Sequence, residues 1–256
     1  MENGLTFDRI WIPFLLTCLA GFSTGLGSIL AFCVKDFKDS YFRFSLGLSA
    51  GAMVYISFVE LLSSAVASVG FLGANIWFFI GIFFILLIDF LIPHQYGEER
   101  VEGAAPGKKM MNAGMVIALG LAIHNFPEGL AVFMSSLGDI RLGLPLAVAI
   151  AIHNIPEGVA VSTPIYYATG SRKKAFWFSF LSGVAEPIGA LAGIFLLFPY
   201  LNEQIMAYSF AFVAGIMVFI GFDEVLPLCY REEGAHLAIS GVILGMAVMA
   251  LSIYLL

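Results

Sequence analysis

The chain has 256 residues, of which 60% are hydrophobic and only 12% are charged, and its mean hydropathy is +0.96. A soluble domain is roughly half apolar and a quarter charged, so this composition excludes an ordinary soluble protein and predicts one that lies in lipid. The formal net charge is −6, and the absence of a basic patch interleaved with aromatic residues excludes nucleic acid as a partner.

Eight runs of the sequence are long and apolar enough to cross a bilayer, since a spanning helix needs about 20 mostly apolar residues. In chain order they cover residues 10–33, 41–66, 73–93, 113–137, 143–169, 174–199, 204–229 and 234–256. The longest polar loop between them runs from about Tyr96 to Met110. We therefore predict an all-α polytopic membrane protein with eight transmembrane helices. Residues 1–256 are expected to form a single transmembrane transporter domain, because the loops leave no room for a soluble one.

Basic residues are divided unevenly between the loops. When alternate loops are assigned to one side of the membrane, ten Lys and Arg share that side, and Arg9 and Arg141 lie opposite. The ten are Lys35, Lys38, Arg43, Arg100, Lys108, Lys109, Arg172, Lys173, Lys174 and Arg231. Because loops rich in Lys and Arg stay in the cytoplasm, we predict a multi-pass protein of the cell inner membrane with both termini outside the cytoplasm.

Parts of the sequence recur within it. Ala122–Val132 (AIHNFPEGLAV) in the fourth run recurs as Ala151–Val161 (AIHNIPEGVAV) in the fifth. Ala50–Leu62 in the second run resembles Ala214–Leu226 in the seventh, and a fainter match relates the first run to the sixth. The last two pairs are five runs apart, so their partners cross the membrane in opposite directions. This indicates an inverted-repeat (3+2+3) architecture, with a site near the midplane where the halves meet.

The repeated motif carries residues that are costly in lipid. An ionisable side chain at the middle of a span costs about 2.5–3.5 kcal/mol on insertion scales, so a cluster of them needs a reason. In a helix, His124 and Glu128 stack on one face, with Asn125 on the flank. The equivalent residues of the second motif are His153, Asn154 and Glu157. If the two helices face each other, two imidazoles, two carboxylates and two amide oxygens converge in one pocket.

This set of donors is typical of a metal site. It favours zinc, iron(II), cobalt(II) or manganese(II) over copper(I), which prefers thiolate or thioether, and over calcium, which takes oxygen alone. A carboxylate can bridge two ions, so the set also fits a two-metal centre. The three cysteines, Cys18, Cys33 and Cys229, are scattered through apolar stretches and are interpreted as small buried hydrophobic residues.

Other ionisable residues lie within or beside the spans. Glu186, followed by Pro187 in the sixth run, is interpreted as an additional ligand, and the alternative is a packing hydrogen bond in its protonated form. Its counterpart under the faint repeat is Thr24, so the symmetry is broken there. Five more residues lie toward the ends of the second, third and seventh runs, either as solvated helix ends or as stations for an entering or leaving ion. They are Glu60, Asp89, His94, Asp223 and Glu224.

Paired HNxPEG motifs in the fourth and fifth of eight runs resemble those of the ZIP (Zrt/Irt-like) metal transporters. The segments at 44–53 (FSLGLSAGAM) and 221–227 (GFDEVLP) look like the bacterial ZupT type within that family. The resemblance covers essentially the whole chain, and it implies a homodimer and an elevator-like or rocking movement. It also implies a two-metal centre, in which one ion is held by His124, Glu128, His153 and Glu157. The other ion is held by Asn125, Glu128, Asn154, Glu157 and Glu186.

We therefore expect a transporter that takes up zinc into the cytoplasm, with iron(II), manganese(II), cobalt(II) and cadmium as further cargo, and that needs no catalytic cofactor. The sequence has no P-loop motif, which disfavours direct use of ATP. The alternative is an intramembrane metal enzyme, in which the same His and Glu residues hold a catalytic metal and a water. The zincin pattern HExxH is absent, because Asn follows each His, and an inverted duplication suits alternating access better than a one-sided reaction.

Overall fold

The structure is a computed structural model, and it describes residues 7–33, 39–91, 106–197, 200, 202–229 and 235–255. Within these ranges the chain is helical and contains no strand. The elements are α1 (Phe7–Cys33), α2 (Asp39–Ile56), η1 (Ser57–Leu62), α3 (Ser63–Leu91), α4 (Pro106–Gly138), α5 (Ile140–Thr169), α6 (Arg172–Gly183), α7 (Ala185–Ala192), η3 (Gly193–Leu197), α8 (Glu203–Ile220), η5 (Gly221–Val225), α9 (Leu226–Cys229) and α10 (Ala235–Leu255), where η marks a π-helix. His94 and the loop at 230–234 lie outside the described residues, as does the loop at 96–110 up to residue 105.

Polar residues at the helix ends explain why the connections are so short. Asp139, Ser171 and Asn202 precede α5, α6 and α8, and each side chain accepts a hydrogen bond from a backbone amide of the first turn. Such caps satisfy amides that have no partner within the helix. Gly170 ends α5 with a φ of 64°, a left-handed conformation that glycine adopts without strain. The helices are thereby joined by turns of a few residues, and α4, α5 and α6 follow one another antiparallel.

Seven stretches of the described residues are long and apolar enough to cross a membrane. They are Ile10–Cys33, Arg43–Phe90, Ile117–Gly138, Ile140–Thr169, Arg172–Leu197, Glu203–Val225 and Ala235–Tyr254. The structure therefore confirms an all-helical polytopic membrane protein. However, the described residues contain seven continuous apolar stretches of this length, rather than the eight expected from the sequence.

The difference arises at Gly70, inside the second stretch. That stretch has 48 residues, which as one straight helix would extend about 70 Å, more than twice the thickness of a bilayer core. Gly70 breaks it with φ 77° and ψ 164°. The rings of Phe58 and Phe78, on either side of the break, have centroids 5.8 Å apart, whereas a straight helix would separate them by about 30 Å. The stretch is thus a hairpin of two adjacent arms, which correspond to the second and third runs.

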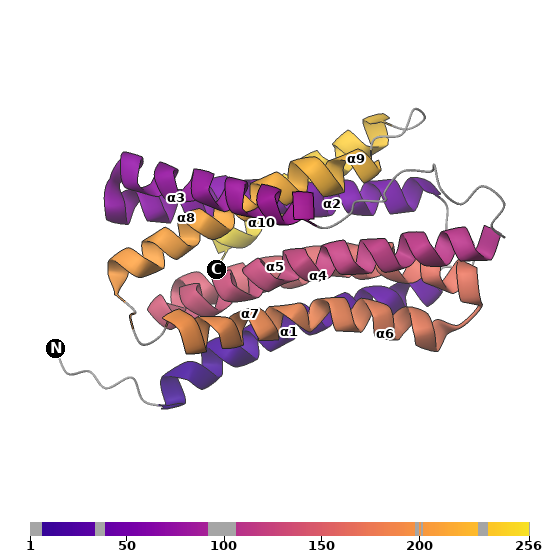
Figure 1. Cartoon of the computed structure of the whole chain (residues 1–256), viewed down its shortest axis with the longest axis horizontal. Helices are drawn as coiled ribbons and strands as arrows, with labels where there is room; N and C mark the ends of the chain where they lie inside the picture. The colour runs from indigo at the N-terminus through magenta and orange to yellow at the C-terminus, as the bar shows by residue number, and fades with distance from the viewer. Residues whose placement is uncertain are drawn as a thin grey trace.

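The helices form two bundles that lie one above the other in Figure 1. In one bundle, α2 packs against α10 and α3 packs against α8. In the other, α1 packs against α5, and α4 packs against α5 and α7. Contacts of α2 with α5 and of α4 with α8 join the bundles. Both halves of the sequence contribute to each bundle, so the bundles are not the two repeats.

Close helix contacts show the inverted repeat directly. Gly51 of α2 lies against the backbone carbonyl of Val242 in α10, and a Cβ atom there would overlap it. Gly215, the equivalent residue of α8, lies in the same way against the carbonyl of Phe78 in α3. The π-helical segments η1 and η5 also begin at equivalent positions of the two repeats. The pairing of α2 with α10 is therefore repeated, inverted, by α8 with α3, which confirms the predicted relation between the halves.

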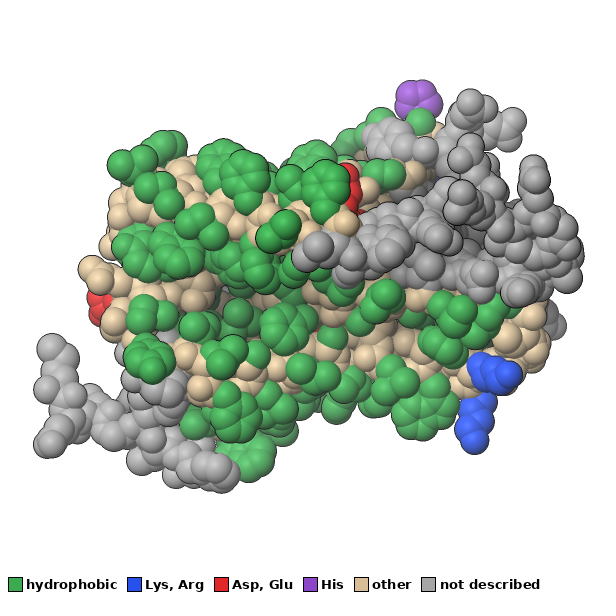
Figure 2. Space-filling model, viewed as in Figure 1, with side chains coloured by type: hydrophobic (Ala, Val, Ile, Leu, Met, Phe, Trp, Pro, Cys, Tyr) green, Lys and Arg blue, Asp and Glu red, His purple; other side chains and the backbone are tan. Residues whose placement is uncertain are grey.

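The surface agrees with a lipid environment. Figure 2 shows hydrophobic side chains spread over the length of the visible face, with charged side chains few in number. Many large apolar side chains on α1, α3 and α10 are more than half exposed, among them Leu19, Phe83 and Ile243. In water such a continuous apolar surface is unfavourable, whereas between lipid chains it has no cost. The fold is that of a multi-pass membrane protein.

We predict that Gly51→Ala destabilises the protein by about 1–3 kcal/mol, because the new methyl group meets a backbone carbonyl that cannot rotate away. Gly73→Ala is the control, since its nearest neighbour would be a Val69 methyl at 3.6 Å, an ordinary contact. Thermal unfolding of the detergent-solubilised protein measures both. Gly51→Ala should melt well below the wild type and Gly73→Ala at or above it, and equal melting temperatures would contradict the close contact.

Candidate metal centre

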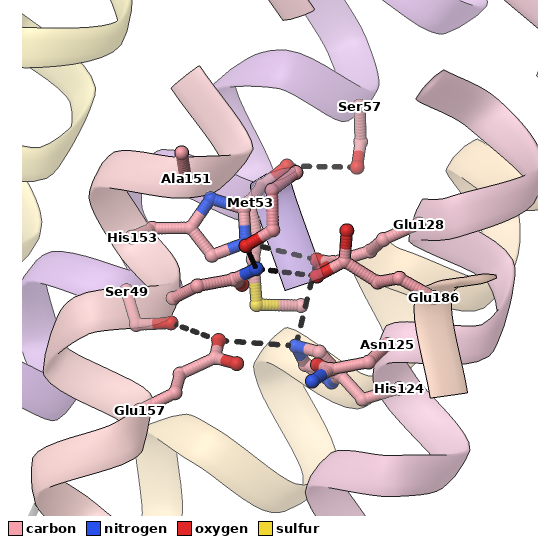
Figure 3. Close-up of polar contacts among 12 residues, drawn as sticks. Ser49, Met53, Ser57, His124, Asn125, Glu128, Ala151, His153, Glu157 and Glu186 are labelled. Atoms are coloured by element: carbon pink, nitrogen blue, oxygen red, sulfur yellow. Dashed lines mark hydrogen bonds and ion pairs between the residues drawn. The ribbon is translucent and has the colours of Figure 1, made fainter. Parts of the chain in front are cut away.

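The structure brings the seven predicted ligand residues together inside the membrane-spanning part. Helix α4 supplies one motif, α5 supplies the other, and α7 supplies Glu186. All seven side chains are at most 1% exposed. They are His124, Asn125, Glu128, His153, Asn154, Glu157 and Glu186. In Figure 3 the labelled members of this set point toward a common centre between the helices.

The histidines and glutamates of the two motifs are paired crosswise. His153 Nε2 lies 3.1 Å from Glu128 Oε1, and His124 Nε2 lies 3.4 Å from Glu157 Oε1. The contact within one helix, from His124 Nε2 to Glu128 Oε1, is longer at 3.6 Å. Each imidazole is therefore closer to the carboxylate of the other motif than to that of its own. This arrangement keeps four ionisable groups together and away from lipid.

The two asparagines are anchored through their amide nitrogens. Asn125 Nδ2 donates to the Ser182 carbonyl at 3.2 Å, and Asn154 Nδ2 donates to the Ala20 carbonyl at 2.9 Å. Asn154 also donates to Glu186 Oε1. Because backbone carbonyls of α6 and α1 hold the amide nitrogens, the amide oxygens point away from those helices. They can accept a hydrogen bond from a group in the centre or coordinate a cation there.

Five buried oxygens of the centre have no hydrogen-bond partner among the described protein atoms. They are Asn125 Oδ1, Asn154 Oδ1, Glu128 Oε2, Glu157 Oε2 and Glu186 Oε2. A buried oxygen without a donor is costly, so five in one place require an explanation. A cation held by these oxygens provides one. They are also the oxygens of the residues that the resemblance assigns to the second ion.

The donors are not yet arranged around an ion. Among the described residues, no three His, Cys, Asp or Glu side chains already surround a common point as metal ligands do. The histidines and glutamates lie beside one another instead: His153 Nε2 forms a hydrogen bond with Glu128, whereas His124 Nε2 has no hydrogen-bond partner among the described atoms.

Two residues of α2 belong to the centre and were not predicted from the sequence. Ser49 Oγ donates to Glu157 Oε1 at 2.6 Å, and Met53, one turn further on, is fully buried and extends its side chain toward the cluster (Figure 3). Among the described residues, Ser49 makes the one hydrogen bond between the cluster's carboxylates and the other bundle. Its signal in the sequence is a single hydroxyl in an apolar run, which is too common to indicate a site.

The remaining predicted ionisable residues lie in other elements. Glu60 lies in η1, and Asp223 and Glu224 lie in η5, the equivalent segment of the second repeat. Asp89 lies near the end of α3, and His94 is outside the described residues. Their interpretation as solvated helix ends or as stations on an ion path stays a prediction.

An inverted repeat and a buried centre of His, Glu and Asn side chains are features of membrane transporters. A family description, ZIP zinc transporter, matches residues 94–253. The chain belongs to this family, as its paired motifs indicate.

Relatives of nearly the same length support this assignment. A zinc transporter ZupT of Oceanobacillus iheyensis is 50% identical over 266 residues, covering 97% of this chain and 99% of the relative. The protein of that name from Streptococcus mutans is 47% identical over 260 residues, covering 97% and 98%. That from Campylobacter jejuni is 47% identical over 286 residues, covering 98% of each. The resemblance to the bacterial ZupT type is confirmed.

We predict that Ser49→Ala lowers the free energy of unfolding by about 1–3 kcal/mol, because it removes a hydrogen bond to a buried carboxylate. The control is Ser68→Ala, since the Ser68 hydroxyl bonds to a carbonyl of its own helix at an exposed position. That change should stay within about 0.5 kcal/mol. Thermal unfolding in detergent compares the two, and an equal effect would show that the bond to Glu157 does not contribute.

Proposed function

We propose that this protein carries zinc across the cell membrane into the cytoplasm, with iron(II), manganese(II), cobalt(II) and cadmium as further cargo. The observation that carries this proposal is the crosswise His and Glu pairing, beside five buried oxygens without donors, at the place where two inverted halves meet. The name of the relatives supports zinc as substrate. The inverted halves favour transport over an intramembrane enzyme reaction.

Two adjacent ion positions explain the composition of the centre. The imidazoles of His124 and His153, with the carboxylates of Glu128 and Glu157, form a mixed nitrogen and oxygen set of the kind that zinc prefers. The five oxygens without donors form a second, oxygen-only set. Glu128 and Glu157 belong to both sets and can bridge two ions. Glu186 belongs to the second set, so it should tune metal preference rather than enable transport.

The division into bundles supports a moving centre. All seven ligands come from α4, α5 and α7, which lie in one bundle. The other bundle contacts their carboxylates through the hydroxyl of Ser49. Movement of the ligand-bearing bundle against the other, as the resemblance implies, would carry a bound ion without separating its ligands. A neutral hydroxyl is a weak link compared with a carboxylate, so it can break and reform during such a movement.

The described basic side chains support the proposed orientation. Arg172, Lys173 and Lys174 open α6 and are exposed, and Figure 2 shows basic side chains gathered at the end of the molecule where α6 begins. Such clusters stay in the cytoplasm. We therefore propose that this end is cytoplasmic and that both termini are outside. A homodimer, implied by the resemblance, is part of the same proposal.

We predict that His124→Ala and Glu128→Ala each abolish zinc uptake, because each removes a ligand of the mixed position while the other helices stay packed. Purified protein in liposomes that contain a zinc-sensitive dye measures uptake. The control is His236→Ala at the exposed start of α10, which should transport like the wild type. Normal uptake by correctly folded His124→Ala or Glu128→Ala protein would remove the motif from the mechanism.

The orientation has its own test. With Cys18, Cys33 and Cys229 replaced by Ala, Arg172→Cys should resist a membrane-impermeant maleimide on intact cells and react after lysis. Arg141→Cys, at the opposite end of α5, should react on intact cells. Both positions are exposed, so access depends on the side of the membrane. Labelling of position 172 from outside would reverse the orientation.

A further inference from the structure

Thr24 of α1 occupies the position in the first repeat that Glu186 occupies in the second. The repeats cross at two glycines, since Gly21 lies against the carbonyl of Gly183 and Gly183 lies against the carbonyl of Gly21. Glu186 follows Gly183 by three residues, and Thr24 follows Gly21 by three. A methyl group on Gly21 would lie 3.1 Å from Glu186 Cβ, and one on Gly183 would lie 3.0 Å from Thr24 Cβ. The two side chains are thus placed symmetrically about the crossing.

Helices α4 and α5, which carry the two motifs, pack against Glu186 and Thr24 in equivalent ways. Gly129, which follows Glu128, packs against the carbonyl of Glu186, and Gly158, which follows Glu157, packs against the carbonyl of Thr24. The glycine that follows Glu128 therefore contacts Glu186, and the glycine that follows Glu157 contacts Thr24. The asparagines follow the same rule, because the Ala20 and Ser182 carbonyls that hold them are equivalent positions of the first and sixth runs.

The hydroxyl of Thr24 is buried and has no partner among the described atoms. Its exposed fraction is 0%, and Oγ1 makes no hydrogen bond there. A threonine in a helix usually bonds to the carbonyl four residues back, as Thr17 does to Pro13 at 3.0 Å. For Thr24 that carbonyl belongs to Ala20, which already accepts from Ser23 Oγ at 2.6 Å and from Asn154 Nδ2 at 2.9 Å. These side chains crowd the Ala20 carbonyl, and Thr24 Oγ1 makes no hydrogen bond to it.

We propose that Thr24 is a specificity-determining residue of the oxygen-only ion position, where its hydroxyl supplies a neutral oxygen opposite Glu186. The inference rests on the proposed function and adds a residue of α1 to the centre. A carboxylate at both symmetric places would add a negative charge to a site that already contains three. A hydroxyl in one place gives an oxygen ligand without that charge. Hard ions such as manganese(II) depend on oxygen ligands, whereas cadmium is also served by the imidazoles of the mixed position.

Metal binding by the purified protein tests this directly. Equilibrium dialysis with manganese(II) or cadmium, followed by elemental analysis, gives the two affinities for the wild type, Thr24→Val, Thr24→Ser and Thr163→Val. Thr24→Val keeps the side-chain shape but removes the hydroxyl, and should weaken manganese binding by about tenfold while leaving cadmium nearly unchanged. Thr24→Ser keeps the hydroxyl and should bind like the wild type. Thr163→Val is the matched control, because the Thr163 hydroxyl is occupied by the Val159 carbonyl of its own helix at 2.7 Å.

The ratio of manganese to cadmium affinity separates ligation from packing. An unchanged ratio in Thr24→Val, whether both affinities persist or both fall together, would overturn the proposal. Thr24→Ala repeats the test if the valine variant is not recovered as folded protein. Glu186→Gln, which alters the opposite side of the same position, should shift the ratio in the same direction. Wild-type liposomes that take up no zinc would refute the proposed function, whereas normal zinc uptake with an unchanged ratio would refute the role of Thr24 alone.

Discussion

The crosswise pairing of His153 with Glu128 and of His124 with Glu157, at 3.1 and 3.4 Å, is the interaction on which the rest of the centre depends. Four ionisable groups with at most 1% exposure could not stay in a membrane interior as isolated charges. Because each motif offers an imidazole to the carboxylate of the other, α4 and α5 must face each other in one register. That register also brings the asparagine oxygens to the same place.

Glycine makes this register possible, because the neighbouring helices must come close enough to hold the asparagines through backbone carbonyls. Gly27 of α1 lies against the Ile155 carbonyl, and Gly189 of α7 lies against the Phe126 carbonyl. These contacts are equivalent in the two repeats and flank the motifs on both sides. The polar centre and the close backbone packing therefore require each other. Residues larger than glycine would move the backbone carbonyls away from the asparagine amides that donate hydrogen bonds to them.

The symmetry has a functional consequence where it fails. A fully symmetric centre would hold two identical half-sites, but Glu186 has a carboxylate where Thr24 has a hydroxyl. In the two-ion centre that we propose, the oxygen-only position is therefore asymmetric in charge, while the mixed position keeps its two imidazoles and two carboxylates. Two such positions with different ligands would fit the proposed transport of several divalent metals.

The sequence by itself determined the spanning runs, the inverted repeat and the seven ligand candidates, because lipid forces long apolar helices and penalises each buried charge. The spacing of His124 and Glu128 on one helix face is a local property of the same kind. The pairing of each histidine with the other motif, and the Ser49 bond to Glu157, depend on how α4, α5 and α2 pack, and only the tertiary structure decided them. The free hydroxyl of Thr24 is a further case, since the carbonyl that would normally bind it is taken by a donor from another helix, which local sequence does not record.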